Sequence, residues 1–344
     1  MKSHQITIKD IARTLGISVS TVSRALKDHP DISPETKNTV RQLAESVGYR
    51  PNALALGLRK NRTFTIGVIV PEIVHHFFST VISGIDDAAY AAGYNTIICQ
   101  SNESCQREAI NMQALIDNRV DGILASVSKS TTDPSHLQHV IDSGIPLVFF
   151  DRVCAGIDCH RVITDDFEGA RIATNHLIAT GCRRIMHLTG PDRLLISKSR
   201  RDGYCTAMRE HGLDVDPDLI IECDSPEAVV EQQSAIVTRA SEIDGIFAIN
   251  DSTAIAAMQL LQSNGYSIPA DVSVMGFGDG PLTEFVRPTL TTVEQKGYDI
   301  GFEATQILIR QIDKGLVNVD FETRVFTPKL HQRSSTHPLP DARN

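Results

Sequence analysis

The chain has 344 residues, of which 41% are hydrophobic and 22% charged, and its net charge is −9. This length allows two or three domains. The sequence has no uncharged apolar run of about 18 residues, and its N-terminus lacks the apolar segment and cleavage site of a signal peptide. We therefore expect a cytoplasmic protein without membrane spans. The seven cysteines are scattered and form no C-x-x-C pair, which argues against a disulfide framework or a zinc ribbon.

The charge is distributed unevenly along the chain. Residues 1–62 contain eleven Lys or Arg against five Asp or Glu, a net charge of +6, which leaves −15 for the rest. The total charge alone argues against nucleic acid. A basic segment on an acidic body, however, is typical of a DNA-binding head joined to a domain with another role.

Two short helices are predicted at the start of the chain. Thr7 followed by Asp10 forms a capping-box pattern, and apolar residues at helical spacing continue to Gly16, a natural left-handed end. Ser18 then caps a second helix, over about residues 19–26.

A third helix is predicted after Ser33, with Pro34 in its first position. Two short helices separated by a tight turn containing glycine, followed by a third that closes the core, make a helix-turn-helix unit. The alternative is a small helical bundle whose Ser and Thr residues only cover a solvated face.

The second helix carries small polar side chains where lysine and glutamate are usual. Such side chains let a helix approach the base edges of the major groove. Val19 suits a thymine methyl group, Ser20 a base edge, and Arg24 the O6 and N7 atoms of guanine. Phosphate contacts are predicted for Thr7, Thr21, Ser23 and Ser33.

The stretch "YRPNALALGLRK" follows the head. Pro51 begins a possible helix that ends at Leu58, and such a helix is too short to be stable alone in water. Its leucines fit the DNA minor groove, where an inserted side chain bends the duplex. The alternative is a linker whose leucines pack on the next domain.

Apolar runs alternate with helical stretches from residue 63 onward. The runs are "TIGVIV", "NTIICQS", "DGILASV", "IPLVFF", "RVITDD", "RRIMHLTG", "DGIFAIN" and "DVSVMGFG". This alternation predicts parallel sheets in α/β domains, and the length suits two lobes. Ligands bind such sheets beyond the carboxyl ends of the strands.

Residues 7–59 resemble the DNA-binding head and hinge helix of the LacI/GalR family, and the resemblance continues through almost the whole chain. It implies an all-α helix-turn-helix head and a core like the periplasmic sugar-binding proteins (type I). Such a core has two doubly wound parallel α/β lobes with a ligand cleft between them. In the hinge, the resemblance implies minor-groove contacts by Asn52, Ala55 and Leu58, with Leu58 as the wedge.

The domain boundaries follow from these patterns. We predict a head over 1–50, a hinge helix and linker over 51–62, a core over 63–333, and a polar tail over 334–344. Lobe 1 is expected over about 63–160 and 293–320, and lobe 2 over about 161–292 and 321–333.

Polar residues that directly follow the apolar runs are the candidate effector ligands. Asp151 and Arg152 follow one run, and Asn250 and Asp251 another. A carboxylate can accept hydrogen bonds from two neighbouring sugar hydroxyls. An aromatic residue after the first run either stacks on the ligand or packs in the core. The family resemblance places Phe78, Asp151, Arg200, Asn250 and Asp251 at the cleft.

Two positions depart from the family pattern. Many relatives have an aspartate where this chain has Gly278; Asp279 comes one step later and either takes that role or points elsewhere. Ser225 or its neighbours stand where relatives often have an aromatic residue. These departures leave the ligand unassigned.

Other chemistry has little support in the sequence. The stretch "GFGDG" fails as a dinucleotide loop because Pro281 occupies the third glycine position, and Walker, G-x-S-x-G and H-E-x-x-H motifs are absent. The adjacent pair His75 and His76 has no partner spacing typical of a metal site. We expect neither an enzyme nor a cofactor or metal.

The combined prediction is a transcriptional regulator, most simply a repressor, that acts on the nucleoid. A homodimer is expected to bind a pseudo-palindromic operator under the control of a small effector. A sugar or sugar derivative is the first expectation for this effector, and a purine-like or phosphorylated ligand is the alternative. The tail has no leucine heptads that would form a tetramer. A solute-binding protein of sugar transport has the same core, but it requires an export signal and has no use for a basic head.

Overall fold

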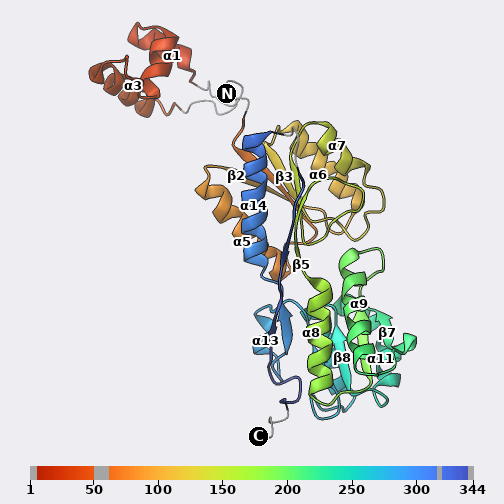
Figure 1. Ribbon diagram of the computed structural model, residues 1–344. Coiled ribbons are helices and arrows are strands. Elements are labelled where there is room, and N and C mark those ends of the chain that lie inside the picture. Colours follow the sequence, from red (N-terminus) through yellow and green to blue (C-terminus); the bar gives the residue numbers. More distant parts are fainter. Residues whose placement is uncertain (1–5, 50–61, 316–319, 340–344) are drawn as a thin grey trace, which may run out of the picture. The chain divides into compact units, whose positions relative to one another are not determined.

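The computed structural model describes residues 6–49, 62–315 and 320–339 (Figure 1). The chain divides into two units, residues 1–63 and 64–344. Asn52, Ala55 and Leu58 of the predicted hinge lie outside the described residues, so the prediction for the hinge stays a prediction.

The head has the three predicted helices, α1 (Ile8–Leu15), α2 (Val19–Leu26) and α3 (Pro34–Ser46). Gly16 ends α1 in the left-handed conformation, with φ 63°. The Ser18 hydroxyl accepts a hydrogen bond from the Thr21 N–H at 3.0 Å and so caps α2. All three helices contribute to one small core, which contains Ile11, Ala12, Val22, Ala25, Val40 and Ala44.

The second unit contains two parallel sheets, and all eight predicted strands are present. The first sheet has the order β11-β5-β4-β3-β1-β2 and the second β7-β6-β8-β9. The predicted strands are β1 (Thr65–Val70), β2 (Asn95–Gln100), β3 (Gly122–Ala125), β4 (Leu147–Phe150), β5 (His160–Thr164), β6 (Ile185–Thr189), β8 (Gly245–Ala248) and β9 (Ser273–Met275). The structure adds β7 (Ile220–Glu222), β10 (Thr292–Glu294), β11 (Thr323–Phe326) and β12 (Lys329–His331).

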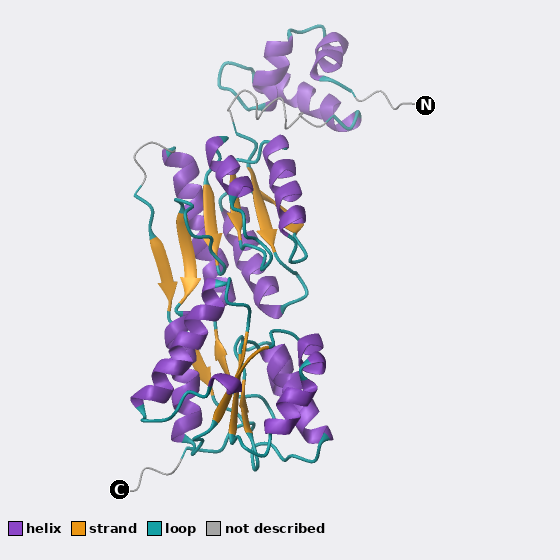
Figure 2. Ribbon diagram, turned by 90° about the vertical axis from the view of Figure 1, so that its right-hand side faces the viewer, coloured by secondary structure: helices purple, strands orange, loops and turns teal. Residues whose placement is uncertain are grey.

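Helices cover both faces of each sheet, because each sheet has an apolar cluster on either side (Figure 2). The first sheet packs α5 (His76–Ala91) and α14 (Gly297–Lys314) on one face, and α6 (Cys105–Asp117) and α7 (Ser135–Asp142) on the other. The second sheet packs α8 (Asp166–Ala179) and α9 (Leu195–Glu210) against one face. Its other face carries α10 (Pro226–Glu231), α11 (Gln233–Arg239) and α12 (Asp251–Ser263). Two short elements, η1 (Pro217–Leu219) and α13 (Leu282–Phe285), lie in loops of this lobe.

The structure corrects the predicted boundary between the lobes. Strand β5 pairs with β4, and β11 pairs with β5, so both belong to the first sheet. The prediction assigned residues 161–164 and 323–326 to lobe 2. It was wrong because the chain crosses between the lobes after β5 and after β11, where the apolar runs end, and not before them.

Two short strands run beside the crossing points. Strand β10 pairs antiparallel with β12, with Thr292 opposite His331 and Glu294 opposite Lys329. Isolated bridges also pair Thr291, directly before β10, with Met275 at the end of β9, and Glu294 of β10 with Gly278. The chain enters α14 directly after β10, so this two-stranded ladder sits where the chain passes between the lobes.

The predicted polar tail begins too early. Ser335 and Thr336 are buried, and the Ser335 hydroxyl donates to the Val274 carbonyl at 2.6 Å. The Val274 N–H in turn donates to the Ser335 carbonyl at 2.8 Å. Residues 334–336 therefore complete the free edge of β9, and their polar side chains are explained by that role. In the described part of the chain, no helix is long and apolar enough to cross a membrane.

Candidate DNA-contacting surface and effector site

Helix α2 presents the three side chains predicted to read bases, Val19 and Ser20 in its first turn and Arg24 in its last. Val19 is 41% exposed, although it is apolar, and Ser20 and Arg24 are also exposed. An exposed valine at the start of a helix contributes little to the head's own core, whereas it suits contact with a base. Thr21 and Ser23 are half-buried on the same helix.

The hydroxyls of this turn form a local network. Ser18 Oγ lies 2.7 Å from Ser20 Oγ and 2.8 Å from Thr21 Oγ1. Because hydroxyl hydrogens rotate freely, these groups can exchange a local partner for a base edge or a phosphate oxygen. The network therefore orients these hydroxyls and leaves them able to bind DNA.

The other two predicted phosphate contacts lie at helix N-termini, which attract anions. Ser33 caps α3 and accepts from the Thr36 N–H at 3.2 Å. Thr7 begins α1, where its N–H and hydroxyl both donate to the Asp10 carboxylate, at 2.9 and 2.6 Å. That carboxylate already occupies the positive end of α1, so Ser33 is the better placed of the two.

The structure also shows a charge cluster that the sequence analysis missed. Lys37 Nζ and Arg41 Nη2 lie 3.2 and 3.1 Å from Asp28 Oδ1. Lys37 holds the pKa of the Asp28 carboxyl below its usual range. These two cations of α3 are therefore partly neutralised inside the head, unlike Arg24 on α2.

In the core, Asp151 is the predicted ligand with the fewest internal partners. It directly follows β4, is 5% exposed and adopts φ 57°, a conformation uncommon for residues other than glycine. The Ser126 hydroxyl lies 3.5 Å from its Oδ2. Burial raises the pKa of Asp151 to about 6, and the negative charge of Asp166 adds to that rise while Arg152 opposes it. A buried carboxyl without a close partner is well suited to bind a ligand hydroxyl.

Arg200 on α9 is buried and contacts a carboxylate, a backbone carbonyl and an aromatic ring. Its Nε and Nη2 lie 2.8 and 2.7 Å from Asp166 Oδ1. Its Nη1 donates to the Ile249 carbonyl at 2.6 Å, and the guanidinium lies 3.8 Å from the centre of the Phe277 ring. Burial raises the pKa of Asp166, while Arg200 acts in the opposite direction. The sequence analysis missed Asp166, although its position after "RVIT" follows the rule used for the other candidates.

The side chains of Arg152 and Phe78 are engaged in internal contacts. Arg152 Nη1 binds both carboxylate oxygens of Glu103, at 2.7 and 2.9 Å. Phe78 is packed in the apolar cluster of the first lobe, and the Arg152 guanidinium lies 5.9 Å from its ring centre. Of the two readings for this aromatic position, the structure favours core packing.

Asn250 and Asp251 begin α12. The Asn250 side chain accepts from the Thr253 N–H at 2.8 Å, and its Nδ2 donates to the Asp224 carbonyl at 2.8 Å. Asp251 accepts from the hydroxyl of Thr292 at 2.5 Å and from the N–H of Gly280 at 2.9 Å. Burial raises the pKa of Asp251 to about 6, and these two hydrogen bonds oppose the rise. A ligand at this point would compete with internal partners for both side chains.

The departure at Gly278 has a steric explanation. Gly278 has φ 140°, and a Cβ atom there would lie 2.9 Å from Asp251 Oδ2. An aspartate would strain the backbone, its Cβ would lie closer to Asp251 than van der Waals contact allows, and it would add a second carboxylate beside the first. Asp279, the next residue, is paired with Arg333, whose Nη2 lies 2.8 Å from Asp279 Oδ1. Ser225, the second departure, caps α10 by accepting from the Ala228 N–H at 3.2 Å.

Lys129 joins the two lobes, and the sequence analysis also missed this residue. Its Nζ lies 3.3 Å from Asp224 Oδ2, and its carbonyl accepts from Arg193 Nε. Its own N–H donates to Glu103 at 2.7 Å, which is the same carboxylate that binds Arg152. The contact between the lobes is therefore linked to the predicted effector region.

Comparison with known proteins defines the family. Residues 7–52 match the model for bacterial regulatory proteins of the lacI family. Residues 63–328 match the model for periplasmic binding proteins and the sugar binding domain of the LacI family. The chain belongs to the LacI family. The match to the head also excludes the alternatives of a simple helical bundle and of a solute-binding protein of transport.

Several characterised relatives match over nearly their full lengths. The chain is 33% identical over 342 residues to the HTH-type transcriptional repressor PurR of Vibrio atlanticus, with 97% of this chain and 99% of the relative covered. It is 32% identical over 309 residues to the ribose operon repressor of Halalkalibacterium halodurans, with 90% and 91% covered.

Solved structures agree with the fold. A complex of the transcriptional regulator CelR with cellobiose matches with a TM-score of 0.73 at 27% identity, covering 96% of this chain and 99% of that one. The lac repressor dimer bound to operator and the anti-inducer ONPF matches with a TM-score of 0.85 at 22% identity, covering 97% and 100%. The LacI-family chain is a DNA-binding transcriptional repressor controlled by an effector in its periplasmic-binding-protein-like core, and it is not an enzyme.

Proposed function

We propose that the repressor binds a pseudo-palindromic operator as a homodimer, with α2 of each head in the major groove. Val19, Ser20 and Arg24 contact bases in this proposal. Thr7, Thr21, Ser23 and Ser33 contact phosphates, and Asn52, Ala55 and Leu58 of the hinge contact the minor groove. One head contacts only a few base pairs, so a two-fold dimer doubles the contacts and fixes the spacing of the half-sites. A repressor acts where the DNA is, which in a bacterium is the cytoplasm.

The proposed effector is a sugar or sugar derivative. The observation that carries this proposal is the buried Asp151 carboxyl at the carboxyl end of β4, which has a hydroxyl at 3.5 Å as its nearest side-chain partner. Neutral polyols bind where carboxylates can accept from adjacent hydroxyls. Two relatives support this class, the ribose operon repressor and the CelR complex with cellobiose.

We assign the other predicted ligands to the same site. Arg152 and Arg200 act on the charge of Asp151, and both are held by acidic partners, so they can donate from fixed positions. In this proposal, Phe78, Asn250 and Asp251 contact the effector while they keep their internal contacts. Asp279 would have to leave Arg333 to bind an effector.

Control follows from differential affinity. An effector can change operator binding only by binding one arrangement of the lobes more tightly than the other. The contact of Lys129 with Asp224 at 3.3 Å is one that such a change would make or break.

A thermal-shift screen tests the effector class. Sugars, sugar phosphates and purines are added to the native chain, to Asp151→Asn, and to the control Asp192→Asn, which alters an exposed acid. A sugar should raise the melting temperature of the native chain and of the control, but not that of Asp151→Asn. Stabilisation by a purine or a phosphate alone would contradict the sugar assignment. Equal stabilisation of all three proteins would contradict the placement of the site at Asp151.

A further inference from the structure

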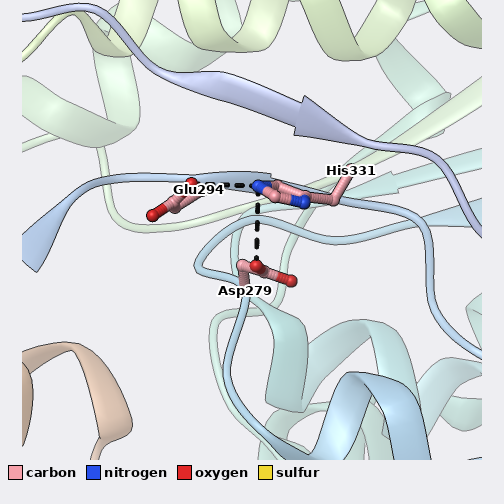
Figure 3. A group of neighbouring side chains, drawn as sticks. All are labelled: Asp279, Glu294 and His331. Atoms are coloured by element: carbon pink, nitrogen blue, oxygen red, sulfur yellow. Dashed lines mark hydrogen bonds and ion pairs between the residues drawn. The ribbon is translucent and has the colours of Figure 1, made fainter.

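Three side chains with metal-binding atoms converge where the chain crosses between the lobes. Only one of them, Asp279, is also a predicted effector ligand. Asp279 lies in the loop after β9, Glu294 at the end of β10 and His331 at the end of β12 (Figure 3). One ligand atom from each residue lies within 4.8 Å of the other two. Three separate segments of the chain therefore bring one nitrogen and two oxygen ligands to one point.

The spacing of these atoms is close to that around a tetrahedral ion. His331 Nε2 lies 2.9 Å from Glu294 Oε2 and 3.7 Å from Asp279 Oδ2. Zinc binds imidazole and carboxylate at about 2.0–2.2 Å, which puts tetrahedral ligand atoms about 3.4 Å apart. The two observed separations lie on either side of that value, so small side-chain rotations suffice to admit an ion.

Access and charge also suit a divalent cation. The side chains of Asp279, Glu294 and His331 are 17%, 36% and 27% exposed, so an ion can enter from solvent. Two carboxylates and a neutral imidazole balance a 2+ charge. Arg333 contacts the other oxygen of Asp279, Oδ1, at 2.8 Å. It also lies 3.3 Å from Glu284, which gives it a second acidic partner. A carboxylate shared between a metal and a guanidinium is an ordinary outer-shell arrangement.

We propose that Asp279, Glu294 and His331 bind a divalent transition metal such as Zn²⁺, with water in the fourth position. This ion would join both strands of the β10–β12 ladder to the loop of Asp279. The neighbouring Gly280 N–H donates to Asp251, so the ion would also fix the loop that holds a predicted effector ligand. Metal binding is measured without sugar or DNA, so its outcome does not depend on the proposed effector.

The experiment is a Zn²⁺ titration of the full chain after removal of metals with a chelator. The native chain should bind one Zn²⁺ per chain at this site. His331→Gln and Glu294→Gln should each weaken that binding at least tenfold, because the loss of even an outer-shell partner typically costs about 10- to 100-fold. The matched control is His75→Gln. His75 lies 2.8 Å from Glu72 but forms a two-residue pair, so this variant should bind Zn²⁺ as the native chain does. Unfolding curves measured in the presence of the chelator show whether each variant is folded. Glu294→Gln keeps the test valid if His331→Gln misfolds.

Cobalt distinguishes this site from the free cysteines of the described chain. Co²⁺ should give the visible absorption of a four-coordinate nitrogen and oxygen site, and this signal should be lost in His331→Gln and Glu294→Gln. Equal binding by the native chain and both variants would overturn the proposal. A sulfur-to-cobalt charge-transfer band that persists in both variants would assign the ion to a thiol and would overturn it as well.

Discussion

Polar side chains are exposed on the surface of α2, whereas those in the effector region of the core are buried and paired with one another. On α2, Ser20 and Arg24 are exposed, and the hydroxyl of Ser18 contacts those of Ser20 and Thr21. In the core, Arg200 is 4% exposed and held by Asp166. The polar side chains of α2 are therefore accessible to DNA. An effector in the core, by contrast, must bind among side chains that already pair with one another. This difference predicts large stability effects in the core and specific DNA effects in the head.

The largest expected effect comes from breaking the buried pair. Asp166→Ala leaves the Arg200 guanidinium buried with the Ile249 carbonyl and without its directly paired carboxylate. The free energy of unfolding should fall by about 3–5 kcal/mol, as measured by urea denaturation. The control Asp192→Ala removes the exposed partner of Arg201 and should cost less than about 1 kcal/mol. Similar losses in the two variants would contradict the contrast between buried and exposed pairs.

A second effect concerns acid stability. His187 on β6 is fully buried between Tyr204 and Phe247, with ring centres at 5.1 and 4.9 Å. Burial lowers the pKa of His187 from 6.5 to about 4. The unfolded chain therefore takes up this proton below about pH 6.5, while the folded chain does so only near pH 4, and stability is lost as the pH falls through that window.

The measurement compares His187→Phe with the native chain in urea at about pH 7 and about pH 4.5. The native chain should lose about 2–3 kcal/mol more than the variant over this interval. His139→Phe, which replaces an exposed histidine, should lose as much as the native chain. If His187→Phe showed the native acid sensitivity, the buried neutral histidine would not be its source.

In the head, Arg24→Ala should weaken binding to the preferred site by about 1–3 kcal/mol and relax the choice of base. Selection of sites from a random DNA pool measures both effects. The control Lys27→Ala removes an exposed cation one residue beyond α2, and it should weaken binding to all sequences about equally. An unchanged site preference in Arg24→Ala would disprove the assignment of α2 as the base-reading helix.

The head could be predicted almost completely because its determinants are local in sequence. Ser18 caps α2 through a residue three positions away, and Gly16 ends α1 by its own conformation. In the core, the strands were predicted from apolar runs, and the polar residues at their ends were found by the same rule. Short strands such as β10 and β12, with three residues each, gave no comparable pattern.

The partners of the core residues could not be predicted, because they are distant in sequence. Asp166 and Arg200 are 34 positions apart, and the partner of Asp279 is Arg333, near the C-terminus. Ser335 was assigned to a solvated tail because its segment is rich in polar residues. In the structure, its hydrogen bonds with Val274 complete a sheet edge. Pairing between distant residues is decided by the tertiary structure, and a single sequence does not reveal it.

The central claim is that a ligand bound in the core controls DNA reading by α2. The most direct test is the fluorescence anisotropy of labelled operator DNA, selected from a random pool, titrated with the full chain with and without the ligand found by thermal shift. The account predicts at least a tenfold change in operator affinity, within the usual range of allosteric coupling, a smaller change on random DNA, and no change in Asp151→Asn. A ligand that binds the core through Asp151 but leaves operator affinity unchanged would contradict the account.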